Sequence, residues 1–464
     1  MRPLAVALLA VLTGCVGFSE DGGFGTVEQA VAERGAGEAK WVRSADEADS
    51  VDARVKELLA QPLSVESAMQ IALLNNPGLQ ARYAELGIAE ADLVQASRWS
   101  GPTLSFARLK RGDEIEREAG LFFDLLGLIS IPLSTKAQEK RFEAVRQRAA
   151  QDALGLALAT RRAWLEAVAA GQTTRYMEDV RLAAEASADL ARRMAQTGNW
   201  PFLTMAREQA FYAETTAQLA NARQAEVAAR EDLTRRMGLW GEQASYALPE
   251  RLPELPAAAR EAGDLESQAL RQRLDVQAAR REAESLAESL GLTRVTRYVD
   301  LLEIGALRNT ETGLPVQRGW ELELRIPIFD FGGARTARAE HQYMQAVNRA
   351  ADAAIRARSE VRESYAAYRT AFDLARHYRD EIVPLRRRIS EEMLLRYNGM
   401  LSSVFELLAD SRATVASVNA YVEAQRNFWI AEANLQVALT TGSPGAMPTA
   451  APAVAAAGGG APAH

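Results

Sequence analysis

The clearest alternation of apolar and charged positions lies in the segment WELELRIPIF, residues 320–329. Side chains along a β-strand point to opposite faces in turn, so this pattern predicts a strand with one apolar and one charged face. After Pro327 the alternation stops, two glycines follow, and a helical Ala/Arg/Glu-rich pattern begins. The apolar positions of the strand, which would share one face, are Trp320, Leu322, Leu324 and Ile326.

Three segments of the first half recur in the second half, in the same order and at an offset of about 200 residues. Repeats in one order and at nearly one offset predict a tandem duplication, with one unit over 64–240, a linker over 241–263 and a second unit over 264–442. The matched pairs are NPGLQARYAELGIAEADL (76–93) with RLDVQAARREAESLAESL (273–290), LISIPLSTKAQEKRFEAV (128–145) with LRIPIFDFGGARTARAEH (324–341), and MAQTGNWPFLTMAREQA (194–210) with LRYNGMLSSVFELLADS (395–411).

Each unit is expected to contain a helix, a β-hairpin and a long helical hairpin, which together make a mainly α protein with a small β part. The helix over 133–196 would be roughly 96 Å long. The first unit would hold a helix over 64–97, a β-hairpin over 103–131 with its second strand at 121–131, and a helical hairpin over 133–237 with its second helix at 202–237. The second unit would hold a helix over 264–290, a β-hairpin over 299–328, and a helical hairpin over 335–441 with helices at 335–397 and 401–441.

Capping residues and prolines mark several of these boundaries. Ser64 and Asp264 are expected to cap the first helix of each unit. Pro132 and Pro327 would close the two β-hairpins, because a missing N–H does no harm at a strand end. Pro384 predicts a kink in the helix over 335–397.

The last helix carries two apolar seams rather than one. One seam would suit a dimeric coiled coil, whereas two adjacent seams let a helix pack on neighbours at both sides, as a closed ring of helices requires. The first seam comprises Val404, Leu408, Val415, Val418, Val422 and Trp429, and the second comprises Leu407, Tyr421, Phe428 and Leu435.

Composition narrows the class of protein. The chain has 464 residues and a formal net charge of −7, which argues against a nucleic-acid-binding protein. No stretch of 18 or more apolar residues follows the N-terminus, so no transmembrane helix is expected. Membrane β-strands are short and only half apolar, so they would escape that test.

The N-terminus has the features of an export signal. Arg2 is followed by an apolar stretch too short to span a bilayer and then by Leu12-Thr13-Gly14-Cys15, which resembles a bacterial lipobox. Residues 1–14 are therefore expected to be a lipoprotein signal peptide, and Cys15, the single cysteine, the site of lipid attachment. The alternatives are an ordinary signal peptide and a buried thiol. Residues 15–63 would be a lipidated linker, and the Ala/Pro/Gly-rich tail over 443–464 would be disordered.

The alternating hairpins admit two interpretations. If the hairpins lie in a bilayer, the N–H and C=O groups at the sheet edges need hydrogen-bond partners, because lipid supplies none. Two hairpins supply four strands, fewer than the roughly eight of the smallest known barrels, so several chains would have to pool their strands; three chains would supply twelve. The alternative is a soluble sheet whose apolar face covers a core. The lipobox and the presence of two matching hairpins favour the membrane.

The chain resembles the TolC-like outer-membrane efflux proteins, the exit ducts of tripartite export systems. The resemblance covers about residues 64–442 and rests on the duplication, on IPIFDFGGAR (326–335) and on RYNGMLSSVFELLADSR (396–412). In the first unit the corresponding IPLSTKAQEK (131–140) lacks the Phe-Asp-Gly-Gly element, so the position of that strand-to-helix junction is open.

The resemblance implies a homotrimer with a helical barrel across the periplasm and a transmembrane β-barrel of twelve strands, an even number within the observed range. The implied location is the bacterial outer membrane, with a lipid anchor and with the strand carrying Trp320, Leu322, Leu324 and Ile326 facing lipid. The implied partners are a periplasmic adaptor protein and an inner-membrane pump. The resemblance also implies that the segment before residue 64 wraps the helices. The helical turns implied to meet the adaptor contain Gly198, Asn199, Asn398 and Gly399.

The family also implies acidic residues that ring the inner aperture of the duct. Alignment on the second helical turn places Glu406 at the first such position and Asp410 one residue beyond the second. These two carboxylates are four residues apart, so they would share one helix face. The alternative is an ordinary solvated surface.

An enzyme is not expected. His341 and His377 lie in no catalytic or metal-ligand motif, and no cofactor is predicted. Methionines near the two helical turns, such as Met194 and Met400, could form a thioether metal site, although adaptable packing against a partner is the simpler explanation. The expected function is a passive duct, with metal ions, drugs or proteins as its cargo; the alternative is a periplasmic coiled-coil scaffold or adaptor without a pore.

Overall fold

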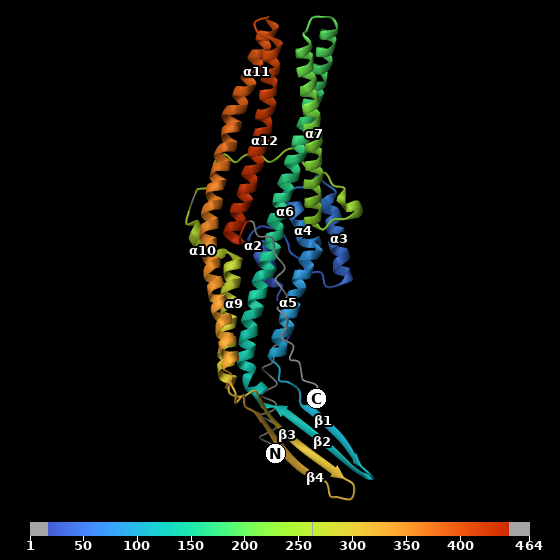
Figure 1. Cartoon of the computed structure of the whole chain (residues 1–464), viewed down its shortest axis with the longest axis vertical. Helices are drawn as coiled ribbons and strands as arrows, with labels where there is room; N and C mark the ends of the chain where they lie inside the picture. The colour runs from blue at the N-terminus through green and yellow to red at the C-terminus, as the bar shows by residue number, and fades with distance from the viewer. Residues whose placement is uncertain (1–16, 262, 445–464) are drawn as a thin grey trace.

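Long helices that run side by side form most of the chain, and a small antiparallel sheet lies beyond one end of them (Figure 1). The computed structural model describes residues 17–261 and 263–444. The expected class, mainly helical with a small sheet, is confirmed. Cys15, the signal segment and most of the tail lie outside the described residues. Within the described part, no helix is both long and apolar enough to cross a membrane.

The two halves of the chain have the same order of elements. The first half contains α4 (Val65–Asn75), α5 (Pro77–Ala96), β1 (Thr103–Arg111), β2 (Glu114–Asp124), α6 (Leu125–Gln196) and α7 (Phe202–Met237). The second half contains α8 (Leu265–Gln272), α9 (Leu274–Thr296), β3 (Leu301–Glu311), β4 (Gln317–Arg325), α10 (Gly333–His377), η3 (Tyr378–Ile382), α11 (Val383–Asn398) and α12 (Val404–Thr440).

The first helix of each half is interrupted, which corrects the single helices expected over 64–97 and 264–290. In the first half the break follows from Pro77, which disfavours a helical conformation at Asn76 (ψ 115°). Asn76 then caps α5 by accepting a hydrogen bond from Leu79 N at 3.0 Å. In the second half Arg273 has the same extended conformation. Ser64 caps α4 as expected, but the side chain of Asp264 makes no capping bond.

The junction between β2 and α6 lies earlier than expected. The strand placed at 121–131 is wrong, because β2 ends at Asp124 and α6 begins at the next residue. Asp124 Oδ1 accepts a hydrogen bond from Gly127 N at 2.8 Å and so starts the helix within the apolar run LFFDLLGLISI. Pro132 lies inside α6 and closes no hairpin. A continuous apolar run does not distinguish a buried strand from a helix, which explains the error.

The two long helices differ in continuity. α6 has 72 residues without interruption, which corresponds to about 108 Å. Its counterpart is divided into α10 and α11 by the π-turn η3, directly before Pro384. A proline has no N–H to donate to the carbonyl four residues earlier, and its ring clashes with that carbonyl. The wider π-turn accommodates both the missing hydrogen bond and the ring. At the position of the expected kink the structure therefore has a π-turn.

The helix α12 packs on neighbours at both sides, as its two seams predict. From the first seam, Val415 contacts the cluster of Met177, Val180 and Leu219 on α6 and α7. From the second, Phe428 packs against the aromatic rings of α10, and its ring centroid lies 5.6 Å from that of Phe372.

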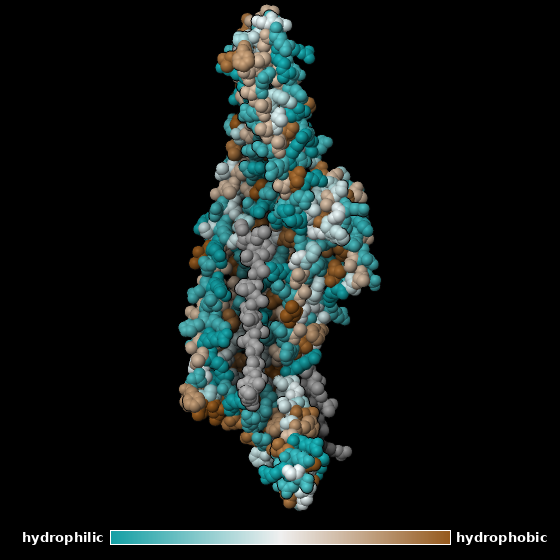
Figure 2. Space-filling view, turned by 45° about the vertical axis from the view of Figure 1, so that its right-hand side comes forward, coloured by the Kyte–Doolittle hydropathy of each residue, from teal (hydrophilic) through white to brown (hydrophobic). Residues whose placement is uncertain are grey.

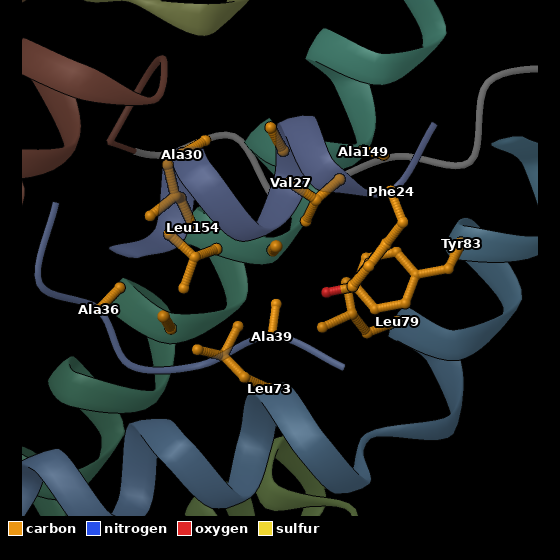
Figure 3. Close-up of a cluster of buried hydrophobic side chains, with 14 of the residues drawn as sticks. Phe24, Val27, Ala30, Ala36, Ala39, Leu73, Leu79, Tyr83, Ala149 and Leu154 are labelled. Carbon is orange, nitrogen blue, oxygen red and sulfur yellow. The ribbon is translucent and has the colours of Figure 1, made fainter. Parts of the chain in front are cut away.

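The segment before α4 folds onto the helices. It forms α2 (Gly25–Glu33) and α3 (Ala45–Leu59), although no clear periodicity indicates them in the sequence. Figure 3 shows Phe24 and Val27 directed into a cluster with Tyr83 and Leu154 from α5 and α6. The rings of Phe24 and Tyr83 meet edge to face with centroids 4.8 Å apart. This contact anchors the N-terminal segment on the first repeat.

Candidate channel surfaces: the sheet and the helical tips

The sheet has a continuous apolar face. Its strands pair in the order β1-β2-β3-β4, and the register aligns Leu104 with Leu121, Leu121 with Ala306, and Ala306 with Trp320. Trp320 is 75% exposed. We call this surface the apolar face; its residues are Leu104, Phe106, Ala119, Leu121, Phe123, Leu302, Ile304, Ala306, Trp320, Leu322 and Leu324.

Of the strand residues expected to share this face, three lie on it. Trp320, Leu322 and Leu324 alternate along β4 and pair with residues of the apolar face on β3. Ile326 lies one residue beyond the end of β4 and is exposed. At the lower end of Figure 2, hydrophobic patches lie above a hydrophilic tip, which matches a sheet that is apolar near the helices and polar near its turns.

The opposite face of the sheet is acidic. The ring of Phe122 lies on this face over Gly120 and over Gly305, its partner on β3. A Cβ on Gly305 would lie 2.3 Å from the ring. A side chain at Gly305 would therefore displace the ring. We call this surface the acidic face; its carboxylates in the paired strands are Glu114, Glu116, Glu118, Asp124, Glu303, Glu311, Glu321 and Glu323.

The second strand-to-helix junction explains the motif IPIFDFGGAR. Asp330 accepts hydrogen bonds from Gly332 N at 3.0 Å and from Ala334 N at 3.3 Å, which satisfies donors at the start of α10. Gly332 has φ +69°, and a Cβ there would lie 2.3 Å from the carbonyl oxygen of Arg297. Arg335 forms an ion pair with Asp300 at 2.6 Å. The motif thus bends the chain from the sheet into the helix.

The corresponding junction of the first repeat has a Phe-Asp pair after all. It lies at Phe123-Asp124, earlier than the segment that contains Pro132. Phe123 stacks on Trp99 with centroids 5.5 Å apart, and Trp99 Nε1 donates to the carbonyl of Asp124 at 2.7 Å. Aligning the two repeats on Pro132 and Pro327 places this junction too late and passes over Asp124. The sequence signal for the earlier helix start is an aspartate three residues before Gly127.

The two helical turns, at the end of the molecule opposite the sheet, have the same geometry (Figure 1). After α6, Asn199 N donates to the carbonyl of Met194 at 2.9 Å, and Gly198 N donates to the carbonyl of Ala195 at 3.1 Å. After α11, Leu401 N donates to Arg396 and Met400 N to Tyr397, at 2.8 and 3.0 Å. Both pairs form the Schellman motif that ends many helices.

The left-handed residue of this motif differs between the two turns. It is Gly198 in the first turn, with φ +77°, and Met400 in the second, with φ +58°. Gly399, which the sequence matches to Gly198, has an ordinary negative φ, and Asn398 is the last residue of α11. Apolar side chains are exposed at both turns: Phe202 and Leu203 in the first, Met400 and Leu401 in the second.

The two acidic residues expected at the aperture lie in different environments. Glu406 is exposed and forms a capping box with Ser403 at the start of α12. A hydrogen bond of 2.6 Å from Ser402 Oγ, together with those from Ser403, lowers the pKa of Glu406. Asp410 is only 8% exposed, and its carboxylate accepts a hydrogen bond of 2.5 Å from Ser390 on α11. The two carboxylates therefore do not form one exposed acidic face.

Comparison with known sequences gives no assignment: no protein-family model matches, and no curated protein matches. Solved structures match the fold. The outer membrane protein VceC of Vibrio cholerae has 16% sequence identity and a TM-score of 0.67, over 84% of this chain and 97% of that one.

Two further solved structures match over similar lengths. The CmeC outer membrane channel of Campylobacter jejuni has 15% identity and a TM-score of 0.64, over 87% of this chain and 90% of that one. The MtrE outer membrane channel of Neisseria gonorrhoeae, in its open state, has 17% identity and a TM-score of 0.64, over 83% and 88%. The chain therefore has the fold of the TolC-like outer-membrane channels.

Proposed function

We propose that this chain is the outer-membrane duct of a tripartite export system and that it works as a homotrimer. The observation that carries the proposal is the confinement of every carboxylate in the paired strands to one face of the sheet, opposite the apolar face. A sheet that faces lipid on one side and water on the other has this distribution. The fold shared with solved outer membrane channels supports the same function.

The edges of the sheet support assembly from several chains. β1 and β4 are the edge strands, and each is paired on one side only within the described chain. Unpaired N–H and C=O groups are too costly in a bilayer to remain exposed. Pairing β1 of one copy with β4 of the next would close the sheet, and three copies would give a barrel of about twelve strands. The duct acts without catalysis.

The helical tips would meet the periplasmic partners. The exposed residues Phe202, Leu203, Met400 and Leu401 supply apolar anchors beside the turns that contain Gly198, Asn199, Asn398 and Gly399. Exposed apolar side chains at a solvent-facing tip are typical of a protein interaction site. We assign this surface to the adaptor, and through it to an inner-membrane pump. The lipid anchor at Cys15 belongs to the same proposal and rests on the lipobox alone.

The acidic face would line the interior of the sheet barrel and favour cations over anions. Metal cations are therefore compatible cargo, with the pump setting the selectivity. At the inner end, Glu406 is the exposed member of the pair Glu406 and Asp410, and we assign it to a ring around the constriction. Single-channel recording of Glu406→Gln in planar bilayers should show reduced cation selectivity, with the buried Asp410→Asn as the control. Unchanged selectivity in Glu406→Gln would remove this residue from the pore.

A pair of adjacent substitutions on β4 tests the main proposal. Leu324 lies on the apolar face and Glu323 on the acidic face. An arginine facing lipid near the bilayer midplane costs roughly 2–4 kcal/mol, whereas one facing water does not. Leu324→Arg should therefore lower the amount of assembled trimer in outer-membrane fractions, and Glu323→Arg should leave it close to the wild-type level. Equal tolerance of both would refute the membrane sheet and favour a periplasmic scaffold without a pore.

A further inference from the structure

Five basic residues gather on the apolar side of the sheet, close to its two turns. The register places Arg108 opposite Arg117 and Arg308 opposite Arg318. Strand alternation puts these side chains on the same side as Phe106 and Trp320. We call this cluster the basic rim; its members are Arg108, Lys110, Arg117, Arg308 and Arg318.

The basic rim is not neutralised by the protein. The paired strand residues on this side of the sheet include no aspartate or glutamate, because the carboxylates of the strands all lie on the acidic face. Across residues 17–261 and 263–444, no member of the rim takes part in an ion pair, and all five are exposed. Like charges directly opposite each other across strands are destabilising. Such an arrangement is stabilised when an anionic partner occupies it.

The position of the rim identifies the partner. It borders the apolar face at the end of the sheet farthest from the helices, as the location of the β1–β2 and β3–β4 turns in Figure 1 shows. A partner that covers both surfaces must combine an apolar body with an anionic head. A membrane lipid with a phosphorylated headgroup has this structure, whereas a soluble polyanion would match the rim alone.

We propose that the basic rim binds phosphate groups of lipid headgroups in the outward leaflet of the outer membrane. The proposal rests on the proposed function, because it requires the apolar face to lie in that membrane. Arginine suits the role, since its planar guanidinium can donate two parallel hydrogen bonds to one phosphate. The cross-strand neighbours Arg308 and Arg318 would hold one headgroup between β3 and β4.

Two double variants with the same change of charge test this inference. Arg308→Gln with Arg318→Gln removes both rim arginines on β3 and β4, which are half of the rim's four arginines. Arg111→Gln with Arg325→Gln removes the two arginines on the acidic side, where Arg325 lies 3.4 Å from Glu323. Full-length protein purified in a neutral detergent would be titrated with bisphosphorylated lipid A, and bound lipid would be counted by native mass spectrometry.

The rim variant should bind lipid A about tenfold more weakly than wild type, through the loss of charge-assisted hydrogen bonds, and the acidic-side variant should bind like wild type. Replacement of Arg308 and Arg318 by lysine should recover part of the affinity, which shows that the fold is intact. Inorganic phosphate at the same concentration should not displace the lipid.

Equal binding by the two glutamine variants, or displacement by inorganic phosphate, would overturn the proposal. A second measurement distinguishes failure of the lipid-binding proposal from failure of the proposed duct function. Wild-type protein is inserted into liposomes and its channel conductance is measured. Conductance together with equal lipid binding would refute the basic rim alone. Absence of both insertion and conductance would refute the duct and the rim together.

Discussion

The two repeats hold the break in their first helix by different chemistry. In the first repeat, Asn76 Nδ2 donates to the carbonyl of Arg236 at 2.8 Å, near the end of α7. In the second, Arg273 is fully buried; its guanidinium contacts Glu360 at 2.8 Å and Asp275 at 2.7 Å, and donates to the carbonyl of Ala438 near the end of α12. Asn76 and Arg273 are the first residues of the matched segments. The break in the first helix is thus held to the end of the last helix by a neutral amide in the first repeat and by a buried charge in the second.

Because Arg273 carries a buried charge and Asn76 a neutral amide, replacing each by alanine should lower the stability of the protein by different amounts. Arg273→Ala leaves two carboxylates without their counter-charge in a largely buried site, which typically costs about 3–5 kcal/mol. Asn76→Ala removes a helix cap and one neutral hydrogen bond, which costs about 1–2 kcal/mol. Thermal unfolding followed by circular dichroism at pH 7.5 measures both. Arg273→Lys is the control that keeps the charge. Equal loss of stability in the two alanine variants would contradict the comparison.

A second contrast concerns carboxylates. In the second repeat, Asp275 and Glu360 have a buried arginine partner. In the first repeat, Asp152 on α6 forms a longer ion pair with the partly exposed Arg82, at 3.9 Å. Burial raises the pKa of Asp152 to about 6, against the opposing influence of Arg82 and Arg148. The native state therefore binds more protons than the unfolded state between about pH 4 and pH 6, and stability falls as pH rises through this window.

Asp152→Asn should consequently be more stable than wild type at pH 7.5, by on the order of 1 kcal/mol, and equal to it near pH 4. Thermal unfolding at the two pH values measures the difference. Asp275→Asn should show the opposite sign at pH 7.5, because it loses the contact with Arg273. A lower stability of Asp152→Asn at pH 7.5 would show that the arginines outweigh burial.

The smallest expected effect concerns the two strand-to-helix junctions. Asp124 caps α6 through one hydrogen bond, and Asp330 serves α10 through two. Each alanine variant should lower stability by about 1 kcal/mol, slightly more for Asp330. Unfolding in guanidinium chloride resolves such differences, and Asp113→Ala, in the turn between β1 and β2, serves as a neutral control. An effect of Asp124→Ala no larger than that of Asp113→Ala would contradict the assigned junction.

Much of the architecture is readable from local pattern. Alternation along β4 identifies the apolar positions Trp320, Leu322 and Leu324, and the double seam of α12 predicts neighbours on both sides. Errors arose where one pattern permits two structures: the apolar run after Leu121 continues from a strand into a helix, and the change occurs at Asp124.

Other features have no local signal. The helix break at Arg273 contains no proline or glycine, and burial of its side chain depends on Glu360, which is 87 residues away in the sequence. The burial of Asp410 similarly depends on Ser390 across the hairpin between α11 and α12. The basic rim becomes visible only once the register between strands is known, because its members come from all four strands. Non-local pairing is the information that a single sequence does not supply.

Because one face of the sheet is apolar and the other acidic, the strands tolerate few insertions or deletions. Inserting one residue into the middle of β4 would shift every later side chain to the other face, and would place Glu323 among Leu302 and Ile304. Inserting residues between the strands, at 312–316, leaves the alternation of both strands intact. Insertions and deletions accepted during evolution should therefore concentrate in the two hairpin turns, so that the part of the protein farthest from the helices varies in length while the strands do not.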